Sequence, residues 1–271
     1  MSLPERFQFT QSSLQDYLDC PRRFQLRYVL DQPWPAVASE PLLERERLAD
    51  LGRRFHQMAQ RQTVGVPIEQ IAVSAQDAEL VKWWRNYLNV PPADLPSAVR
   101  RAEVTLTTPL GVHRLSAKYD LLALEPGRRA VIVDWKTERK RPTRAQLAER
   151  MQTRVYRYVL VQAGAALNGG RPIQPGQVSL VYWFAEFPAE PEVLPYNSAQ
   201  HADDEAFLTS LVDEIAVRTE AEWPKTSEET RCKYCTYRSL CNRGVAAGVG
   251  DESDVELDLE ITLSEVEEIA Y

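Results

Sequence analysis

The amino-acid sequence predicts an α/β protein with a helical N-terminal part, a central mixed β-sheet flanked by helices, and a C-terminal part closed by cysteines. Two changes of pattern along the chain support this prediction. Apolar residues recur at helical spacing up to about residue 89, and they alternate with polar residues, as in strands, over 98–137. Three of the four cysteines then fall within ten residues, at Cys232, Cys235 and Cys241.

The N-terminal part is predicted to be helical. Residues 10–30 are expected to form a helix that Ser12 or Ser13 caps and that Pro21 interrupts, because proline lacks the amide hydrogen that a helix interior needs. Two further helices are predicted over residues 42–62 and 74–89.

The central part is predicted to be a sheet with a helix packed against it. The segments 112–127 and 128–137 are expected to form a hairpin, because a Pro-Gly turn separates them. A long helix that ends at Gly164 should follow. The remaining elements are a strand over 98–111, a strand over 176–184 and a helix over 202–223.

Length and composition bound the class of protein. A chain of 271 residues suffices for one large domain or two small ones. No apolar run approaches the length of a membrane span, and the first residues lack the apolar core of a signal peptide. We therefore expect a cytoplasmic protein that does not associate with membranes.

Charge is distributed unevenly along the chain. The whole chain carries −7, but residues 251–271 hold nine acids and no lysine or arginine, which leaves the rest at +2. The region 250–271 is therefore predicted to be an acidic tail. Such a tail is either a disordered, solubilising end or a segment that competes with a polyanion or recruits a partner.

The cysteines indicate a metal centre. Cys232, Cys235 and Cys241 have C-x2-C-x5-C spacing, and Cys20 stands alone near the N-terminus. Four thiolates can hold either zinc or a [4Fe–4S] cluster, and disulfides are rare in a cytosolic chain. Zinc sites usually combine two close pairs, so a trio with one remote partner favours the cluster. Zinc and unligated thiols remain as alternatives.

A second candidate site lies where the strand "VIVDWKT" ends in charged residues. Asp134 and Lys136 share one face of this strand and Trp135 points to the other. A strand end with an exposed ion pair would explain this pattern alone. The hairpin, however, can bring Asp120 near Asp134, and two converging carboxylates suit Mg²⁺ or Mn²⁺. Lys136 could then orient an attacking water, so the set suits phosphodiester hydrolysis.

These residues resemble a known family. The "D…DWK" pattern after an apolar strand resembles the PD-(D/E)XK nuclease core, which implies a restriction-endonuclease-like fold. "SSLQDYLDCPRRFQLRY", "LGRRFHQMAQ" and "MQTRVYRYVL" are similar, in order, to the N-terminal, G-x-x-x-H and Q-x-x-x-Y motifs of the RecB-like branch. The cysteine pattern resembles the cluster-bearing members, which include AddB-type proteins and a CRISPR-associated adaptation nuclease. Ala117 stands where the family often has glycine.

The resemblance implies roles for individual residues. Metal ligands would be His56, Asp120, Asp134 and the backbone carbonyl of Trp135, and Lys136 would be the catalytic lysine. Cys20, Cys232, Cys235 and Cys241 would hold the iron–sulfur cluster.

Three residues have an ordinary structural explanation as well. Gln152 and Tyr156 would hold the site or the DNA backbone, but they also form a common i, i+4 helical pair. Glu103 begins a strand and is explained equally well as a solvated residue, so the predicted site leaves it out.

Two functional hypotheses follow. The first is a Mg²⁺- or Mn²⁺-dependent deoxyribonuclease, an exonuclease of DNA repair or recombination, in which residues 1–249 form a single domain that includes the cluster. Its substrate would be DNA that is single-stranded or has a free end, and the basic run after Lys136 could follow the DNA backbone. The second is a non-cleaving subunit that binds DNA or a partner in a helicase–nuclease or CRISPR adaptation complex. The chain has no phosphate-binding loop of the G-x-x-x-x-G-K-[ST] type, so it is not itself a helicase.

Overall fold

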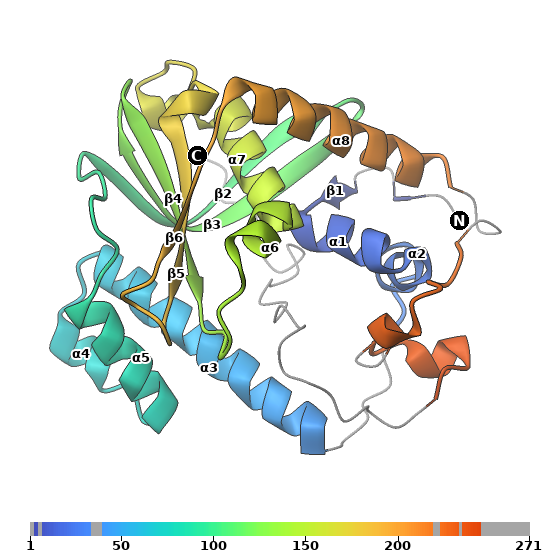
Figure 1. The fold of residues 1–271 in the computed structure, drawn as a ribbon, viewed down its shortest axis with the longest axis horizontal. Helices are drawn as coiled ribbons and strands as arrows, with labels where there is room; N and C mark the ends of the chain where they lie inside the picture. The colour runs from blue at the N-terminus through green and yellow to red at the C-terminus, as the bar shows by residue number, and fades with distance from the viewer. Residues whose placement is uncertain (1–2, 5–6, 34–39, 219–222, 233–234, 245–271) are drawn as a thin grey trace.

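A computed structural model describes residues 3–4, 7–33, 40–218, 223–232 and 235–244, with backbone only for 40–46. The predicted acidic tail therefore lies outside the described residues. A mixed sheet forms the centre of the molecule, and helices cover parts of both its faces, which confirms the predicted fold class (Figure 1). Within the described part, no helix is both long and apolar enough to cross a bilayer.

The chain starts with a short strand and two short helices. Strand β1 spans Gln8–Phe9, α1 spans Gln11–Asp19 and α2 spans Pro21–Phe24, so Pro21 starts a new helix. A π-helical turn continues over Gln25–Val29. The predicted cap is wrong: Thr10 caps α1, and Ser13 sits three residues further on as its capping-box partner.

Three helices precede the main strands. The long helix α3 spans Glu40–Thr63, α4 spans Ile68–Ala72 and α5 spans Ala78–Asn89. The longest and last of these match the two predicted helices, and the single-turn α4 between them was not predicted.

The sheet has six strands. Its order is β1-β3-β4-β5-β6, with β2 paired to β3. Strands β2, β3 and β4 are antiparallel neighbours, whereas β1 runs parallel to β3 and β5 runs parallel to β4. The bounds are β2 Val99–Leu110, β3 His113–Glu125, β4 Arg129–Lys136, β5 Val178–Phe184 and β6 Glu192–Pro195.

The helix predicted over residues 143–164 is divided. It consists of α6, Arg144–Glu149, and α7, Met151–Ala163, which ends at Gly164 as predicted. The break falls at Arg150, whose ψ of 139° is not helical. Helix α8 spans Ser198–Ala216, so it begins and ends earlier than predicted.

Two hydrophobic cores lie on the two faces of the sheet. One combines strand residues such as Leu122 and Ile132 with α7, α8 and α1, and the other combines Leu121 and Val133 with α3 and α5. The pattern of β3 changes at residue 120. Before it, odd-numbered residues belong to the α7 core, and after it even-numbered ones do. Glu103, which the register places opposite Asp120 on β2, has a left-handed φ of 53°. At this point the side chains of both strands exchange the faces to which they point, while the pairing register stays the same.

Candidate active site

The end of β4 carries buried charges. Asp134 and Lys136 are 2% and 9% exposed, and they share one side of the strand as predicted. Trp135 points to the opposite side, where its ring packs against those of Tyr87 and Trp183 at 5.3 and 5.7 Å. The alternative of an exposed strand end does not hold, because these charges lie inside the protein.

The hairpin brings Asp120 to the same place. Pairing of β3 with β4 stops at Leu121 and Val133, and the next position along the same register sets Asp120 opposite Asp134. The Oδ2 atom of Asp120 accepts a hydrogen bond of 2.8 Å from the backbone N–H of Trp135. A carboxylate thus replaces the backbone carbonyl that would continue the ladder.

Helix α3 and strand β2 complete the cluster. Nδ1 of His56 lies 3.1 Å from Oδ1 of Asp120. His56, Glu103 and Asp120 each offer a ligand atom, and these three atoms lie within 4.8 Å of one another, as in a site for a metal ion. Glu103 also forms an ion pair with Lys118 at 2.7 Å. Asp134 is not a member of this three-residue group but lies next to it on the neighbouring strand.

Two polar atoms of the cluster lack hydrogen bonds. Nε2 of His56 and Oδ2 of Asp134 are buried and have no hydrogen-bond partner among the described residues. Nζ of Lys136 lies 3.2 Å from that Oδ2 atom, so Asp134 and Lys136 form an ion pair. Because a buried polar atom whose hydrogen-bonding capacity is not used costs free energy, the two atoms suit a bound cation.

The cluster displaces the pKa values of its members. Burial and the charge of Asp120 raise the pKa of Asp134 to about 7, although Lys136 opposes this. Burial also acts on Asp120, but the charge and hydrogen bond of His56 outweigh it and hold the pKa of Asp120 below its ordinary value. For His56, burial lowers the pKa and Asp120 raises it, and the net direction is upward. Without a bound cation, the negative charge of Asp134 is thus disfavoured, whereas that of Asp120 is favoured.

Helix α7 supplies a side chain that holds the site. Nε2 of Gln152 donates to Oδ1 of Asp134 at 2.8 Å, and its Oε1 accepts from Nζ of Lys136 at 2.8 Å. Tyr156, one turn further on, accepts a hydrogen bond from Gln11 at 3.5 Å, and its ring lies 5.0 Å from that of Tyr119. Gln152 therefore joins the candidate site directly, whereas Tyr156 connects α7 to α1 and β3.

Glu103 is the residue of this cluster that the prediction from sequence considered and left out. Its left-handed φ of 53° is unusual for a glutamate within a strand, and it turns the carboxylate toward Asp120 across the β2–β3 pair. The sequence contained one signal, an acid within an otherwise alternating strand. An ordinary solvent-exposed acid on a strand gives the same pattern, so this signal could not distinguish a site residue from a surface residue.

The cysteines also come together. Cys20 lies at the junction of α1 and α2, and it lines the same cavity as Cys232, Cys235 and Cys241. The cavity wall includes the cationic residues Arg23, Lys225, Arg231 and Arg243. Burial raises the pKa of the Cys235 and Cys241 thiols. A guanidinium nitrogen of Arg243 donates to Sγ of Cys232 at 3.0 Å.

Comparisons with known proteins cover most of the chain. A model of the PD-(D/E)XK nuclease superfamily matches residues 8–242. The chain is similar in fold to a crystal structure from Eubacterium rectale that is provisionally named an exonuclease, with a TM-score of 0.54 and 11% identity over 91% of each chain. A second solved structure, SSO0001, has a TM-score of 0.43 and 13% identity over 88% of this chain and 87% of its own, which is too distant to support an argument. No curated protein matches the chain in sequence.

Proposed function

The chain belongs to the PD-(D/E)XK nuclease superfamily and has its restriction-endonuclease-like fold, and from this premise we propose that it is a Mg²⁺- or Mn²⁺-dependent deoxyribonuclease. Exonuclease activity in DNA repair or recombination is part of the proposal. The structural neighbour's name, which concerns that protein, agrees with an exonuclease.

One observation carries the proposal. The ligand atoms of His56, Glu103 and Asp120 lie within 4.8 Å of one another, beside the buried pair Asp134 and Lys136. Carboxylate oxygens are the ligands that Mg²⁺ and Mn²⁺ prefer. Oδ2 of Asp134 and Nε2 of His56, which have no hydrogen-bond partner among the described residues, provide further ligand atoms, so the residues fit the ion. The backbone carbonyl of Trp135 remains a predicted ligand.

Each group of the chain has a task in hydrolysis. A divalent cation held here would lower the pKa of a bound water and offset charge on the scissile phosphate. Lys136 holds its ammonium group beside Asp134, where it can orient the attacking water and stabilise developing negative charge. Gln152 fixes the separation of those two side chains through its amide. Asp120 orients the imidazole of His56.

The test is a digestion of labelled DNA with Mn²⁺ and with EDTA. Wild type should cleave only with the metal, and Lys136→Ala should lose at least about 100-fold in rate, the scale of a removed electrostatic stabiliser. Lys82→Ala is the matched control, because Lys82 is an exposed lysine on α5 that pairs with Glu186. End-labelled and circular DNA in parallel separate exonuclease from endonuclease activity. Cleavage that Lys136→Ala leaves unchanged would remove the assignment.

The proposal includes a [4Fe–4S] cluster on Cys20, Cys232, Cys235 and Cys241. Its support is that these four side chains, from segments about 210 residues apart, line one cavity with cationic residues around it. Cationic neighbours suit a centre with four thiolate ligands, whose combined charge is negative. Zinc is the alternative, and iron and zinc analysis of the purified protein distinguishes the two.

The remaining predictions are also part of the proposal. They are the RecB-like branch, a single domain over 1–249 with an acidic tail over 250–271, a cytoplasmic location, and a helicase or CRISPR adaptation protein as partner. The non-cleaving alternative is less favoured, because the cluster of acids is assembled together with its lysine.

A further inference from the structure

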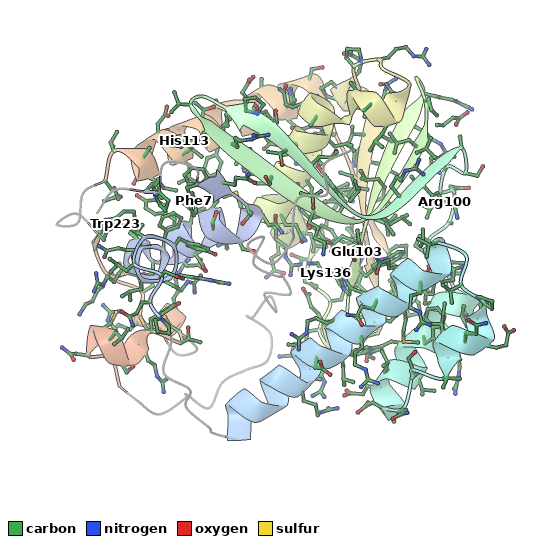
Figure 2. The ribbon with its side chains drawn as sticks, turned by 180° about the vertical axis from the view of Figure 1, so that it is seen from behind. Phe7, Arg100, Glu103, His113, Lys136 and Trp223 are labelled. Carbon is green, nitrogen blue, oxygen red and sulfur yellow. The ribbon has the colours of Figure 1, made fainter. Side chains whose placement is uncertain are left out.

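One part of the sheet has a face that no helix of the described residues covers, and we call it the uncovered face. Helix α7 packs on β2, β3 and β5, and α3 packs on β2 and β3 from the opposite side. In the view of Figure 2, α3 passes beside the labelled Glu103 and Lys136, and none of the helices that the structure describes lies in front of the half of the β2–β3 hairpin that leads to His113. The uncovered face therefore begins at the candidate active site.

Apart from Pro109, which pairs with Arg114, the side chains on this face form a polar strip. It comprises Gln8, Thr105, Thr107, Arg114, Ser116 and Lys118, and we call these six residues the hairpin strip. Strand alternation places them opposite Leu115, Ala117 and Tyr119, which lie in the α7 core. Ser116 lies beneath the other five and is only 1% exposed, and its hydroxyl lies 2.8 Å from that of Thr107 and donates to Gln8 at 3.1 Å. The side chains of the strip that a ligand can reach are therefore those of Gln8, Thr105, Thr107, Arg114 and Lys118.

The charges of the hairpin strip are all positive until the active site is reached. Arg114 is exposed, and no carboxylate pairs with it among the residues that the structure describes. Lys118 lies two residues before Asp120, is 35% exposed and pairs with Glu103. No aromatic side chain belongs to the strip. Such a surface can bind phosphates, but it offers no stacking platform for bases.

We propose that one strand of the nucleic-acid substrate lies along the hairpin strip, with its phosphates on Arg114, Lys118 and the threonine hydroxyls, and enters the active site at Asp120. This inference rests on the proposed function and names the surface that binds the substrate. From Arg114 to Asp120 the strip is about 20 Å long, since strand residues rise about 3.3 Å each. The proposed contacts are to the phosphate backbone of the nucleic acid, so binding along the strip does not depend on the base sequence.

Burial of the active site bears on the form of the substrate. Asp134 is 2% exposed, and the side chains of His56 and Asp120 are each 15% exposed. A flexible single strand can bend in from the strip toward these largely buried groups more easily than a stiff duplex can. The hairpin strip therefore binds a single strand, either free or unpaired at the end of a duplex.

Binding can be measured without cleavage. A fluorescein-labelled oligothymidylate of about 15 nucleotides, within the usual site sizes of single-strand binders, is titrated with the full chain in EDTA and followed by anisotropy. The variants are Arg114→Glu and, as the matched control, Arg128→Glu. Arg128 is a 76% exposed arginine in the turn at the other end of β3. Both variants change the net charge equally, so a difference between them reports position.

Arg114→Glu should weaken binding about tenfold and reduce the slope of log affinity against log salt by about 0.7, the value for one phosphate contact on a single strand. Arg128→Glu should change affinity less than twofold. Thr107→Val, which removes a neutral contact, should have a smaller effect than Arg114→Glu. Circular dichroism of each variant verifies the fold.

Equal effects of Arg114→Glu and Arg128→Glu on affinity would overturn the assignment of the hairpin strip as the binding surface. A blunt duplex that binds as tightly as the single strand, with the same dependence on Arg114, would overturn its assignment to one strand. Cleavage with Mn²⁺ is measured separately. A chain that binds through Arg114 and never cleaves would contradict the proposed function alone, whereas a chain that cleaves and binds without Arg114 would contradict the strip alone.

Discussion

The ammonium group of Lys136 lies 2.8 Å from Oε1 of Gln152. The same amide uses its nitrogen to donate to Asp134, so one side chain of α7 sets the spacing between an acid and a lysine at the end of β4. Both contacts are buried, where hydrogen bonds to charged groups are strongest. Gln152 therefore acts on the candidate chemistry through its two neighbours.

Gln152→Ala is expected to lower the rate of DNA cleavage by about 10- to 100-fold, the usual cost of removing a group that orients a catalytic residue. The loss should fall on kcat more than on KM, because Gln152 positions Lys136 and Asp134 and is not itself expected to contact the substrate. Gln162→Ala is the control, since Gln162 is on the same helix and contacts His201, away from the site. Equal rates for the two variants would show that the amide has no positioning role.

Glu103→Gln is expected to weaken Mn²⁺ binding at least about tenfold, because it removes one anionic ligand from the group with His56 and Asp120. Isothermal titration calorimetry measures this affinity without DNA. Glu125→Gln, at the far end of β3, is the control, since Glu125 pairs with Arg128 and Arg129 on the surface. A wild-type affinity for Glu103→Gln would exclude this glutamate from the metal site.

The raised pKa of Asp134 predicts a pH dependence of stability in the metal-free chain. Its folded pKa is about 7 and its ordinary value is 3.8, so between these values the folded state binds more protons than the unfolded state. The free energy of unfolding should therefore fall as pH rises from about 4 to about 7. The decrease from this residue is on the order of a few kcal/mol, because each unit of difference in pKa corresponds to about 1.4 kcal/mol.

Asp134→Asn tests this dependence. In EDTA, the variant should be more stable than wild type at pH 8 and should lose less stability between pH 5 and pH 8, as measured by urea unfolding. The same variant should fail to cleave DNA with Mn²⁺. Parallel pH profiles for wild type and Asp134→Asn would show that this carboxylate carries no such penalty.

Cys232→Ala is expected to lower both the iron content and the thermal stability of the protein. A cluster that joins Cys20 to the C-terminal trio closes a loop of about 210 residues, and long closures restrict the unfolded chain most. Ser239→Ala, in the 3-10 turn that leads to Cys241, is the control. A stable, iron-free Cys232→Ala variant would contradict a structural role for the cluster. Zinc in place of iron in the purified wild-type protein would identify the centre as a zinc site.

Predictions from local pattern succeeded where the chain's own periodicity decides the structure. The strand that ends in Asp134 and Lys136 and its hairpin with the strand of Asp120 follow from alternation and one Pro-Gly turn. Short elements were missed, because β1 has two residues and β6 has four, too few for a periodic signal. The break at Arg150 was missed as well, since neither Gly nor Pro marks it.

The sequence by itself determined which residues could form the two candidate centres: an acid, a following lysine and a distant acid, and one cysteine with a remote trio. Tertiary structure alone decided that Glu103 joins His56 and Asp120, that Gln152 bridges Asp134 and Lys136, and that no described helix covers one face of the β2–β3 hairpin. The physical reason is distance along the chain. Local pattern encodes which way a side chain points on its own strand, whereas contacts between β2, α3 and α7 depend on how the strands twist and how helices pack on them.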